Sequence, residues 1–366
     1  MTSPPERVPA VWRGEAALGR LGELLPGLGC RSVALILDGA VKGYGARVAD
    51  SFDGAEVLVH IVPSGEPTVA SVDAAAAAAR ALDAPLIVGV GGGSALDTAK
   101  QVAVVLAAPH SIGHYLLGRH SFAGRRPIVA IPTTAGTGAE ATRTCILTDE
   151  AGRKVWTRAE EMLPDVVVLD PAATATMPAA VTVATGLDAF VHAVEAVTGQ
   201  RRAERPPEPA LRAVGLVVEH LPRVVAQGDD LAARAGMQEA AYLAGTAIGG
   251  CGTGIAHSIG HALGTLYHVP HGAAVAIGLE TALDWNVQGA PDAFAGVAAA
   301  LGTGVAEVPD EFRQLWGHCG FAGVVAGLPE RDLEAGAIAE AMVAEENLPM
   351  YRNSCRLASD RERREL

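Results

Sequence analysis

"LIVGVGGGSALDTAK", residues 86–100, is an apolar run that ends in three consecutive glycines and continues into residues that favour a helix. This order predicts a buried strand, a tight turn and the start of a helix. In such a unit, backbone N–H groups and the positive end of the helix can bind a phosphate. Gly91, Gly92, Gly93 and Ser94 are therefore candidate contacts for a nucleotide. A sharp strand-to-helix turn without any ligand explains the glycines alone equally well.

Apolar, β-rich segments also lie on either side of this unit, and residues 69–82, which include a run of alanines, favour a helix between two of them. Strands this apolar, separated by helices, predict a parallel sheet covered on both faces. We therefore expect an α/β domain over residues 1–177. The other predicted strands are residues 32–39, 55–63, 127–134 and 166–171.

Two further features stand at the ends of predicted strands. Thr133 and Thr134 begin a second Gly/Thr-rich loop in "IPTTAGTGAEAT", residues 131–142. Ligands of open α/β sheets bind at the carboxyl edge, so this loop favours the nucleotide interpretation. Asp38 ends the strand in "LILDG". An acid there could accept hydrogen bonds from an adenosine ribose and repel a 2′-phosphate, which favours NAD over NADP. An ordinary turn residue is the alternative.

The pattern changes after Met177, where alanine- and leucine-rich stretches with helical spacing replace the valine runs. We predict that residues 178–366 form an all-helical domain. Residues 199–212 are rich in proline and charge and predict a surface loop. The expected helices cover residues 179–198, 209–226, 230–248, 254–266 and 330–345.

Composition limits the possible partners. The 366 residues carry a formal net charge of −13, which argues against nucleic acid because such partners require a basic surface. The cysteines Cys30, Cys145, Cys251, Cys319 and Cys355 show no pairing or zinc-ribbon spacing and suggest a reducing cytoplasm. Neither a signal peptide nor an uninterrupted apolar run of about 18 residues is recognisable, so we expect no membrane segment. A small molecule is the expected partner.

Histidines and one aspartate predict a metal site in the helical half. Asp188 and His192 are four residues apart on one apolar helix, and His257 and His261 are four apart on another, with His271 in the next loop. Buried carboxylates and imidazoles are costly unless they are paired or bind a cation. One such helical pair can also be an ordinary core feature. Nitrogen and oxygen ligands suit Fe(II), Zn(II), Co(II) or Ni(II).

Four stretches in the same order resemble the iron-containing (group III) alcohol dehydrogenase family: "GGGSALDTAK", "PTTAGTGAE", "TGLDAFVHAVE" and "HSIGHALGTLYHVPHG". The resemblance covers nearly the whole chain. It implies an N-terminal Rossmann-like α/β domain, an all-α C-terminal domain and an active site in the cleft between them. It also implies assembly as a homodimer or a larger ring.

The resemblance assigns a role to each motif residue. It places Asp188, His192, His257 and His271 at the metal-ligand positions and His261 at a proton-relay position. It places Asp38 where NAD preference is set, Thr133 and Thr134 near the nicotinamide, and Lys154 near the nicotinamide ribose. The residues that match the cofactor loop are Gly91, Gly92, Gly93, Ser94 and Asp97.

The chain also departs from the family pattern. Ala139 stands where the family usually has serine, and Arg143 stands where uncharged residues are common. These changes bear on the choice of substrate. Arg143 has a simpler interpretation as a strand residue that faces outward, and Cys251, near the metal helix, as a small core residue.

The function implied is a metal-dependent, NAD(H)-linked oxidoreductase that interconverts a small alcohol and its aldehyde or ketone, with Fe(II) or Zn(II) as the divalent metal. One alternative is a cyclase like dehydroquinate synthase, which requires a basic cluster to hold a substrate phosphate. Another is a protein that binds nucleotide and metal without turnover.

Overall fold

The computed structural model describes residues 7–29, 31–330 and 332–366, so Cys30 lies outside the described residues. Two compact units make up the chain: residues 1–134 with 139–174, and residues 135–138 with 175–366. The predicted boundary after residue 177 differs slightly from this division. The short segment 135–138 groups with the helical unit, which no local sequence pattern indicated.

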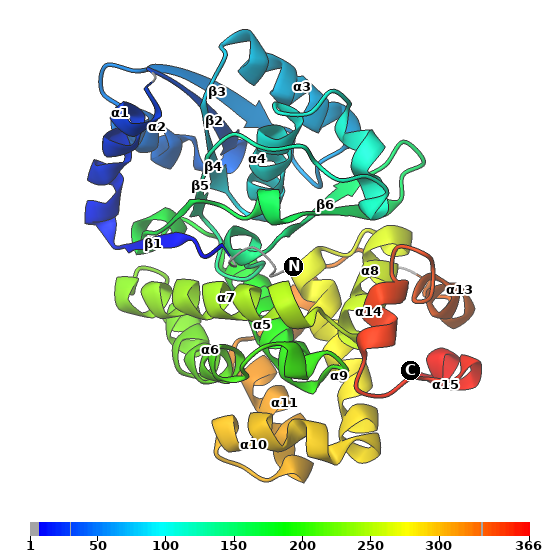
Figure 1. Ribbon diagram of the computed structural model, residues 1–366. Coiled ribbons are helices and arrows are strands. Elements are labelled where there is room, and N and C mark those ends of the chain that lie inside the picture. Colours follow the sequence, from blue (N-terminus) through cyan, green and yellow to red (C-terminus); the bar gives the residue numbers. More distant parts are fainter. Residues whose placement is uncertain (1–6, 30, 331) are drawn as a thin grey trace. The chain divides into compact units, whose positions relative to one another are not determined.

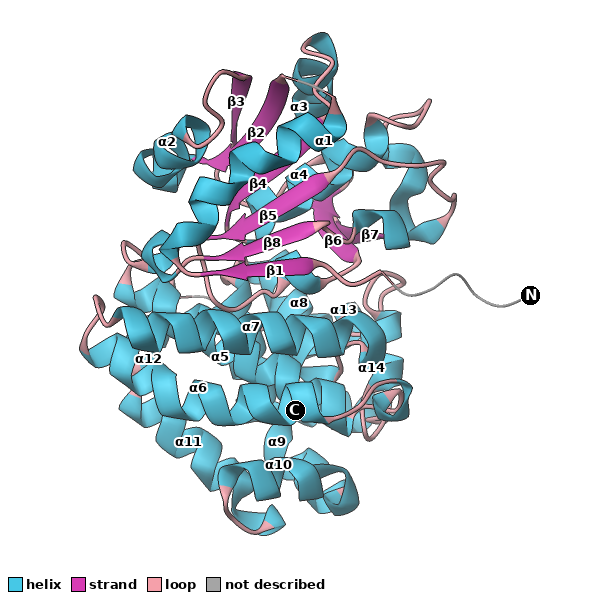
Figure 2. Cartoon of the chain, turned by 60° about the vertical axis from the view of Figure 1, so that its left-hand side comes forward, coloured by secondary structure: helices cyan, strands magenta, loops and turns pink. Residues whose placement is uncertain are grey.

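The first unit contains the predicted parallel sheet. Its strands follow the order β1 (Ala10–Arg13), β8 (Val166–Leu169), β5 (Ile128–Pro132), β4 (Leu86–Gly91), β2 (Ser32–Asp38) and β3 (Glu56–Val62), as Figure 2 shows. All neighbouring pairs are parallel. After β3 the chain returns to the other side of β2, so the direction of winding reverses between β2 and β4. The carboxyl ends of these two strands therefore form the expected ligand position of such a sheet.

Alternating side chains cover both faces of this sheet, as the apolar strands predicted. Ala34 and Ile36 of β2 pack with α3 (Val69–Ala81) and α4 (Gly93–Val105). Val33 and Leu35 point the other way, into a core shared with α1 (Leu24–Leu28) and α2 (Lys42–Asp50). The strand β1 and the antiparallel hairpin of β6 (Thr144–Thr148) and β7 (Lys154–Arg158) were not predicted. Their sequences, AVWR, TCILT and KVWTR, include polar or charged residues and lack the continuous apolar runs of the strands that were predicted.

The second unit contains helices and no strand among its described residues, which confirms the predicted all-α fold. The long helix α5 (Ala179–Thr198) contacts α6 (Glu208–Ala226), α7 (Leu231–Cys251) and α9 (His271–Gly289), and α8 (Ile255–Tyr267) packs against α9 (Figure 1). The remaining helices are α10 (Ala295–Leu301), α11 (Val308–His318), α12 (Phe321–Ala326), α13 (Ala335–Ala341), α14 (Leu348–Asn353) and α15 (Asp360–Glu365).

By length and composition alone, α5 is apolar enough to cross a membrane. However, 78% of its most apolar window is buried inside the protein, as expected for a core helix. Polar side chains also interrupt this apolar helix. Asp188, His192 and Glu195 are all buried on it, and such groups require partners.

Candidate functional site

One group of potential metal ligands exists among the described residues, and it consists of the four predicted residues Asp188, His192, His257 and His271. Their ligand atoms all lie within 4.8 Å of one another. Asp188 Oδ1 is 3.6 Å from His192 Nε2 and 3.8 Å from the Nε2 atoms of both His257 and His271. Three imidazoles on three helices thus point the same nitrogen at one carboxylate oxygen.

These separations fit a divalent cation. Nitrogen and oxygen ligands at 2.0–2.1 Å from a tetrahedral metal lie about 3.4 Å apart. The distances of 3.6 and 3.8 Å from Asp188 Oδ1 to the three imidazoles are slightly longer than this. Asp188 is 0% exposed, and neither carboxylate oxygen has a hydrogen-bond partner. A buried carboxylate in this condition is unfavourable without a cation. Burial also lowers the pKa of His192 from its ordinary value, which favours the neutral ring that a metal requires.

Local packing explains how His271 reaches the cluster. The sequence placed it in a loop, whereas it is the first residue of α9. A Cβ atom on the next residue, Gly272, would lie 2.5 Å from the carbonyl oxygen of Ala184 on α5. The glycine therefore allows the first turn of α9 to approach α5 one turn before Asp188. By contrast, His268 is exposed at the end of α8 and is not part of the cluster.

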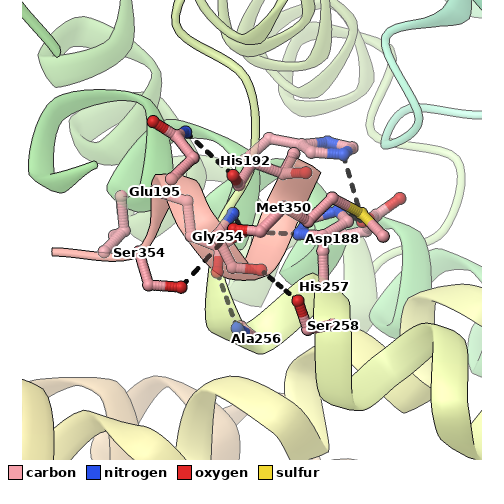
Figure 3. A network of polar contacts seen from close by, with 12 residues as sticks. Asp188, His192, Glu195, Gly254, Ala256, His257, Ser258, Met350 and Ser354 are labelled. Atoms are coloured by element: carbon pink, nitrogen blue, oxygen red, sulfur yellow. Dashed lines mark hydrogen bonds and ion pairs between the residues drawn. The ribbon is translucent and has the colours of Figure 1, made fainter. Parts of the chain in front are cut away.

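The Nδ1 atoms of three histidines have separate partners. His192 Nδ1 lies 3.3 Å from the carbonyl oxygen of Gly136. His257 Nδ1 lies 2.6 Å from Glu195 Oε2 (Figure 3). His261 Nδ1 lies 3.2 Å from Asn347 Oδ1. Each acceptor favours a proton on Nδ1 and leaves Nε2 as the nitrogen with the lone pair.

Sequence reasoning gave no role to Glu195 or Asn347. The spacing in the sequence could have identified Glu195, because it shares the buried face of α5 with Asp188 and His192. Asn347 lies far from His261 in the sequence, and nothing in its local pattern points to that contact.

Seven of the nine predicted cofactor residues lie at the carboxyl edge of the sheet in the first unit: Asp38, Gly91, Gly92, Gly93, Ser94, Thr133 and Thr134. A Cβ on Gly91, whose φ of +154° suits glycine, would lie 2.6 Å from the Cβ of Asp38. One on Gly92 would lie 3.2 Å from Thr134 Cγ2. Thr133 donates its backbone N–H to the Gly91 carbonyl, and Gly93 and Ser94 open α4. The loop after β4 thus lies between the ends of β2 and β5.

Asp97, Lys154 and Asp38 also have contacts that the sequence did not suggest. Asp97 is buried, and its oxygens accept from Lys100 Nζ at 3.2 Å and from the Ile146 backbone N–H at 2.8 Å. It thereby ties α4 to β6, while its contact with the cofactor stays a prediction. Lys154 on β7 forms an ion pair with Glu66. Asp38 accepts a hydrogen bond from the Ala40 N–H at 2.9 Å.

The outward-facing interpretation of Arg143 is wrong. The side chain is buried, and its Nε donates to Glu160 Oε2 at 2.7 Å. The Glu160 carboxylate explains how the guanidinium can be buried, since buried charges require partners. Cys251 is buried in the helical core, as the simpler interpretation predicted.

Comparison with known proteins covers both units. Residues 9–171 match the family model for iron-containing alcohol dehydrogenase, and residues 182–351 match the C-terminal model of the Fe-containing alcohol dehydrogenase family. The probable alcohol dehydrogenase EutG of Salmonella typhimurium is 34% identical over 80% of this chain and 75% of its own. The NAD-dependent methanol dehydrogenase of Bacillus methanolicus is 33% identical over 81% of this chain and 79% of its own.

A solved structure shows the same fold. Sulfoacetaldehyde reductase from Bifidobacterium kashiwanohense, in complex with NAD+, superimposes with a TM-score of 0.87 at 25% identity. The match covers 100% of this chain and 97% of that one.

Proposed function

Since the chain belongs to the iron-containing alcohol dehydrogenase family, we propose that it interconverts a small alcohol and its aldehyde or ketone by hydride transfer with NAD(H). Two of the relatives named above are a methanol dehydrogenase and a sulfoacetaldehyde reductase, and the structure of the reductase contains NAD+. The observation that carries the proposal is the convergence of three imidazole Nε2 atoms on the buried oxygen of Asp188.

Each group of residues has one task in this proposal. Asp188, His192, His257 and His271 would hold Fe(II) or Zn(II), which when bound supplies the Lewis acidity that lowers the pKa of an alcohol oxygen. The Gly91–Gly93 loop and the start of α4 would bind the pyrophosphate of NAD(H), the hydride carrier.

We propose that His261 moves the proton released when an alcohol is oxidised. Asn347 Nδ2 donates to the Ala341 carbonyl at 2.8 Å, so Asn347 Oδ1 is the atom turned towards His261 Nδ1. This arrangement favours Nε2 of His261 as the proton acceptor. Both side chains are buried, so we expect the contact with Asn347 to orient the ring.

The test is a screen for NADH oxidation with small aldehydes and ketones, with the metal content of the same sample measured. Sustained NADH consumption in a metal-containing sample would support the proposal. It would also exclude a protein that binds without turnover. A dehydroquinate-synthase-like cyclase recycles its NAD and would not consume NADH steadily. A sample that contains metal but does not consume NADH would therefore favour the cyclase.

The variant His271→Ala tests the ligand set directly. We expect metal affinity to fall by more than the 10–100-fold typical of substitutions outside the ligand shell, together with loss of activity. His271 is partly exposed, so the fold should persist. His318→Ala, at an exposed position on α11, is the matched control and should retain metal. A fully metal-loaded and active His271→Ala enzyme would remove this residue from the ligand set.

A further inference from the structure

Glu195 is a buried carboxylate that is not one of the four candidate ligands. It lies on α5, three residues beyond His192, and is 5% exposed. Its carboxylate accepts hydrogen bonds from the start of α8. Gly254 N–H donates to Oε2 at 2.7 Å, Ala256 N–H donates to Oε1 at 2.7 Å, and His257 Nδ1 lies 2.6 Å from Oε2 (Figure 3).

These contacts determine which nitrogen of His257 carries the proton. An ionised carboxylate only accepts hydrogen bonds, so its partner Nδ1 must be the donor. Nε2 then keeps its lone pair and points at Asp188 Oδ1, 3.8 Å away. The same carboxylate satisfies N–H groups at the N-terminus of α8, where negative charge is favourable. One side chain therefore sets both the position of α8 and the tautomer of His257.

Two of the other histidines have an uncharged acceptor at Nδ1. The acceptor at His192 Nδ1 is a backbone carbonyl, and the acceptor at His261 Nδ1 is a side-chain amide. The Glu195 contact is also the shortest of the three. Hydrogen bonds to a charged acceptor are stronger than neutral ones, and a carboxylate partner raises the basicity of a ligating imidazole. Among these three rings, His257 should gain most from its partner.

We propose that Glu195 is a positioning residue that presets His257 for a divalent cation and thereby sets the metal affinity of the site. The inference rests on the proposed function, because it takes Asp188, His192, His257 and His271 as the ligands. Two carboxylates and three neutral imidazoles carry a charge of −2. A divalent cation neutralises this buried group, whereas a trivalent one leaves it positive.

The first experiment measures binding of Zn²⁺ and Co²⁺ to metal-free protein by competition with a chelator. Glu195→Gln keeps the size of the side chain but removes its charge and one of its acceptors. We expect it to weaken Zn²⁺ binding 10–100-fold and to alter the visible spectrum of bound Co²⁺. Glu219→Gln, an exposed substitution on α6, is the control and should bind both metals as the wild type does.

The second experiment reads the tautomer directly, by NMR of metal-free protein with ¹⁵N-labelled histidine. His257→Gln identifies the signal of His257. We expect the proton on Nδ1 in the wild type and a change in Glu195→Gln. The wild-type spectrum shows which nitrogen of His257 carries the proton, so it tests the proposal even if Glu195→Gln does not fold.

The outcomes are distinguishable. A wild type with the His257 proton on Nε2, or a folded Glu195→Gln protein with unchanged metal affinity, overturns the role of Glu195. A wild type that binds neither metal instead contradicts the proposed function.

Discussion

Glu140 is a buried acid whose pKa is raised by its surroundings. It lies in the η4 turn (Ala139–Ala141) of the first unit and is 2% exposed. Burial raises its pKa to about 7, and the nearby Lys100 only partly opposes this shift. Because the native pKa is above that of the unfolded chain, the native state binds the proton more tightly.

We predict that Glu140 makes stability depend on pH. The contribution is fully present below about pH 4.5 and is lost as the pH rises to about 7, amounting to roughly 3 kcal/mol of unfolding free energy. Glu140→Gln should therefore gain stability relative to wild type as the pH rises from 5 to 7.5 in urea unfolding. Glu150→Gln, at an exposed turn position of the same unit, should show no such trend. A constant difference between Glu140→Gln and wild type across this range would contradict the prediction.

Asp38 provides a second test at the residue scale. A carboxylate about 5 Å from the 2′-phosphate of NADP would oppose its binding by about 1–3 kcal/mol, which corresponds to roughly 5–150-fold. We predict that the wild type prefers NADH and that Asp38→Gly reduces this preference, measured as the ratio of kcat/KM for NADH and NADPH. Asp53→Gly, at an exposed position, should leave the ratio unchanged. Equal or better use of NADPH by the wild type would show that Asp38 does not select the cofactor.

At the scale of elements, glycines allow the backbone of α7 to pack closely against the segment 135–138. A Cβ on Gly245 of α7 would lie 2.6 Å from the Gly138 carbonyl oxygen. The same segment supplies Gly136, whose carbonyl faces His192 Nδ1. This close backbone packing therefore helps to place a partner of a candidate ligand.

We predict that Gly245→Ala destabilises the protein by about 1–3 kcal/mol, the usual effect of overpacking a core. It should also weaken metal binding, because the 135–138 segment must shift. The matched control is Gly215→Ala on α6, where an added Cβ meets nothing within 4 Å. That substitution should be neutral or stabilising, since alanine favours a helix. Chemical denaturation and metal titration of both variants provide the measurement, and a Gly245→Ala protein as stable as Gly215→Ala would contradict the packing argument.

At the scale of the whole molecule, the two units have separate cores. Ala34 and Val33 belong to clusters on the two faces of the sheet, whereas Leu187 and Ile255 belong to clusters of the helical unit. The candidate metal ligands all lie in the helical unit, and the candidate pyrophosphate loop lies in the other. Bound metal and bound NAD should therefore stabilise different parts of the chain.

We predict that Zn²⁺ slows hydrogen exchange in α5 and α8, and that NAD+ slows it in residues 86–105. At a concentration of 100 times its Kd, each ligand should add about 2.7 kcal/mol to the stability of the state it binds. Exchange measured by mass spectrometry, with His271→Ala as the control for zinc, gives the comparison. If Zn²⁺ slowed hydrogen exchange only in the first unit, the assignment of the metal site to the helical unit would be contradicted.

Homo-oligomer formation and a cytoplasmic location stay predictions.

The sequence alone determined the fold class and the residue types of the candidate site. Runs of valine and isoleucine separated by helical segments predicted the parallel sheet, because residue periodicity is a local property of the chain. The four-residue spacings of Asp188 with His192 and of His257 with His261 placed each pair on one helix face for the same reason. The family resemblance then selected four ligands, and the structure brings these residues together.

Only the tertiary structure decided which groups become partners. The pairing of Glu195 with His257, the contact of Asn347 with His261 and the burial of Arg143 against Glu160 join segments that no local pattern connects. The same is true of residues 135–138, which group with the helices rather than with the sheet. Periodicity indicates which face of an element is buried, but it does not indicate what that face meets. That depends on how the whole chain packs and on which buried polar groups must find a partner.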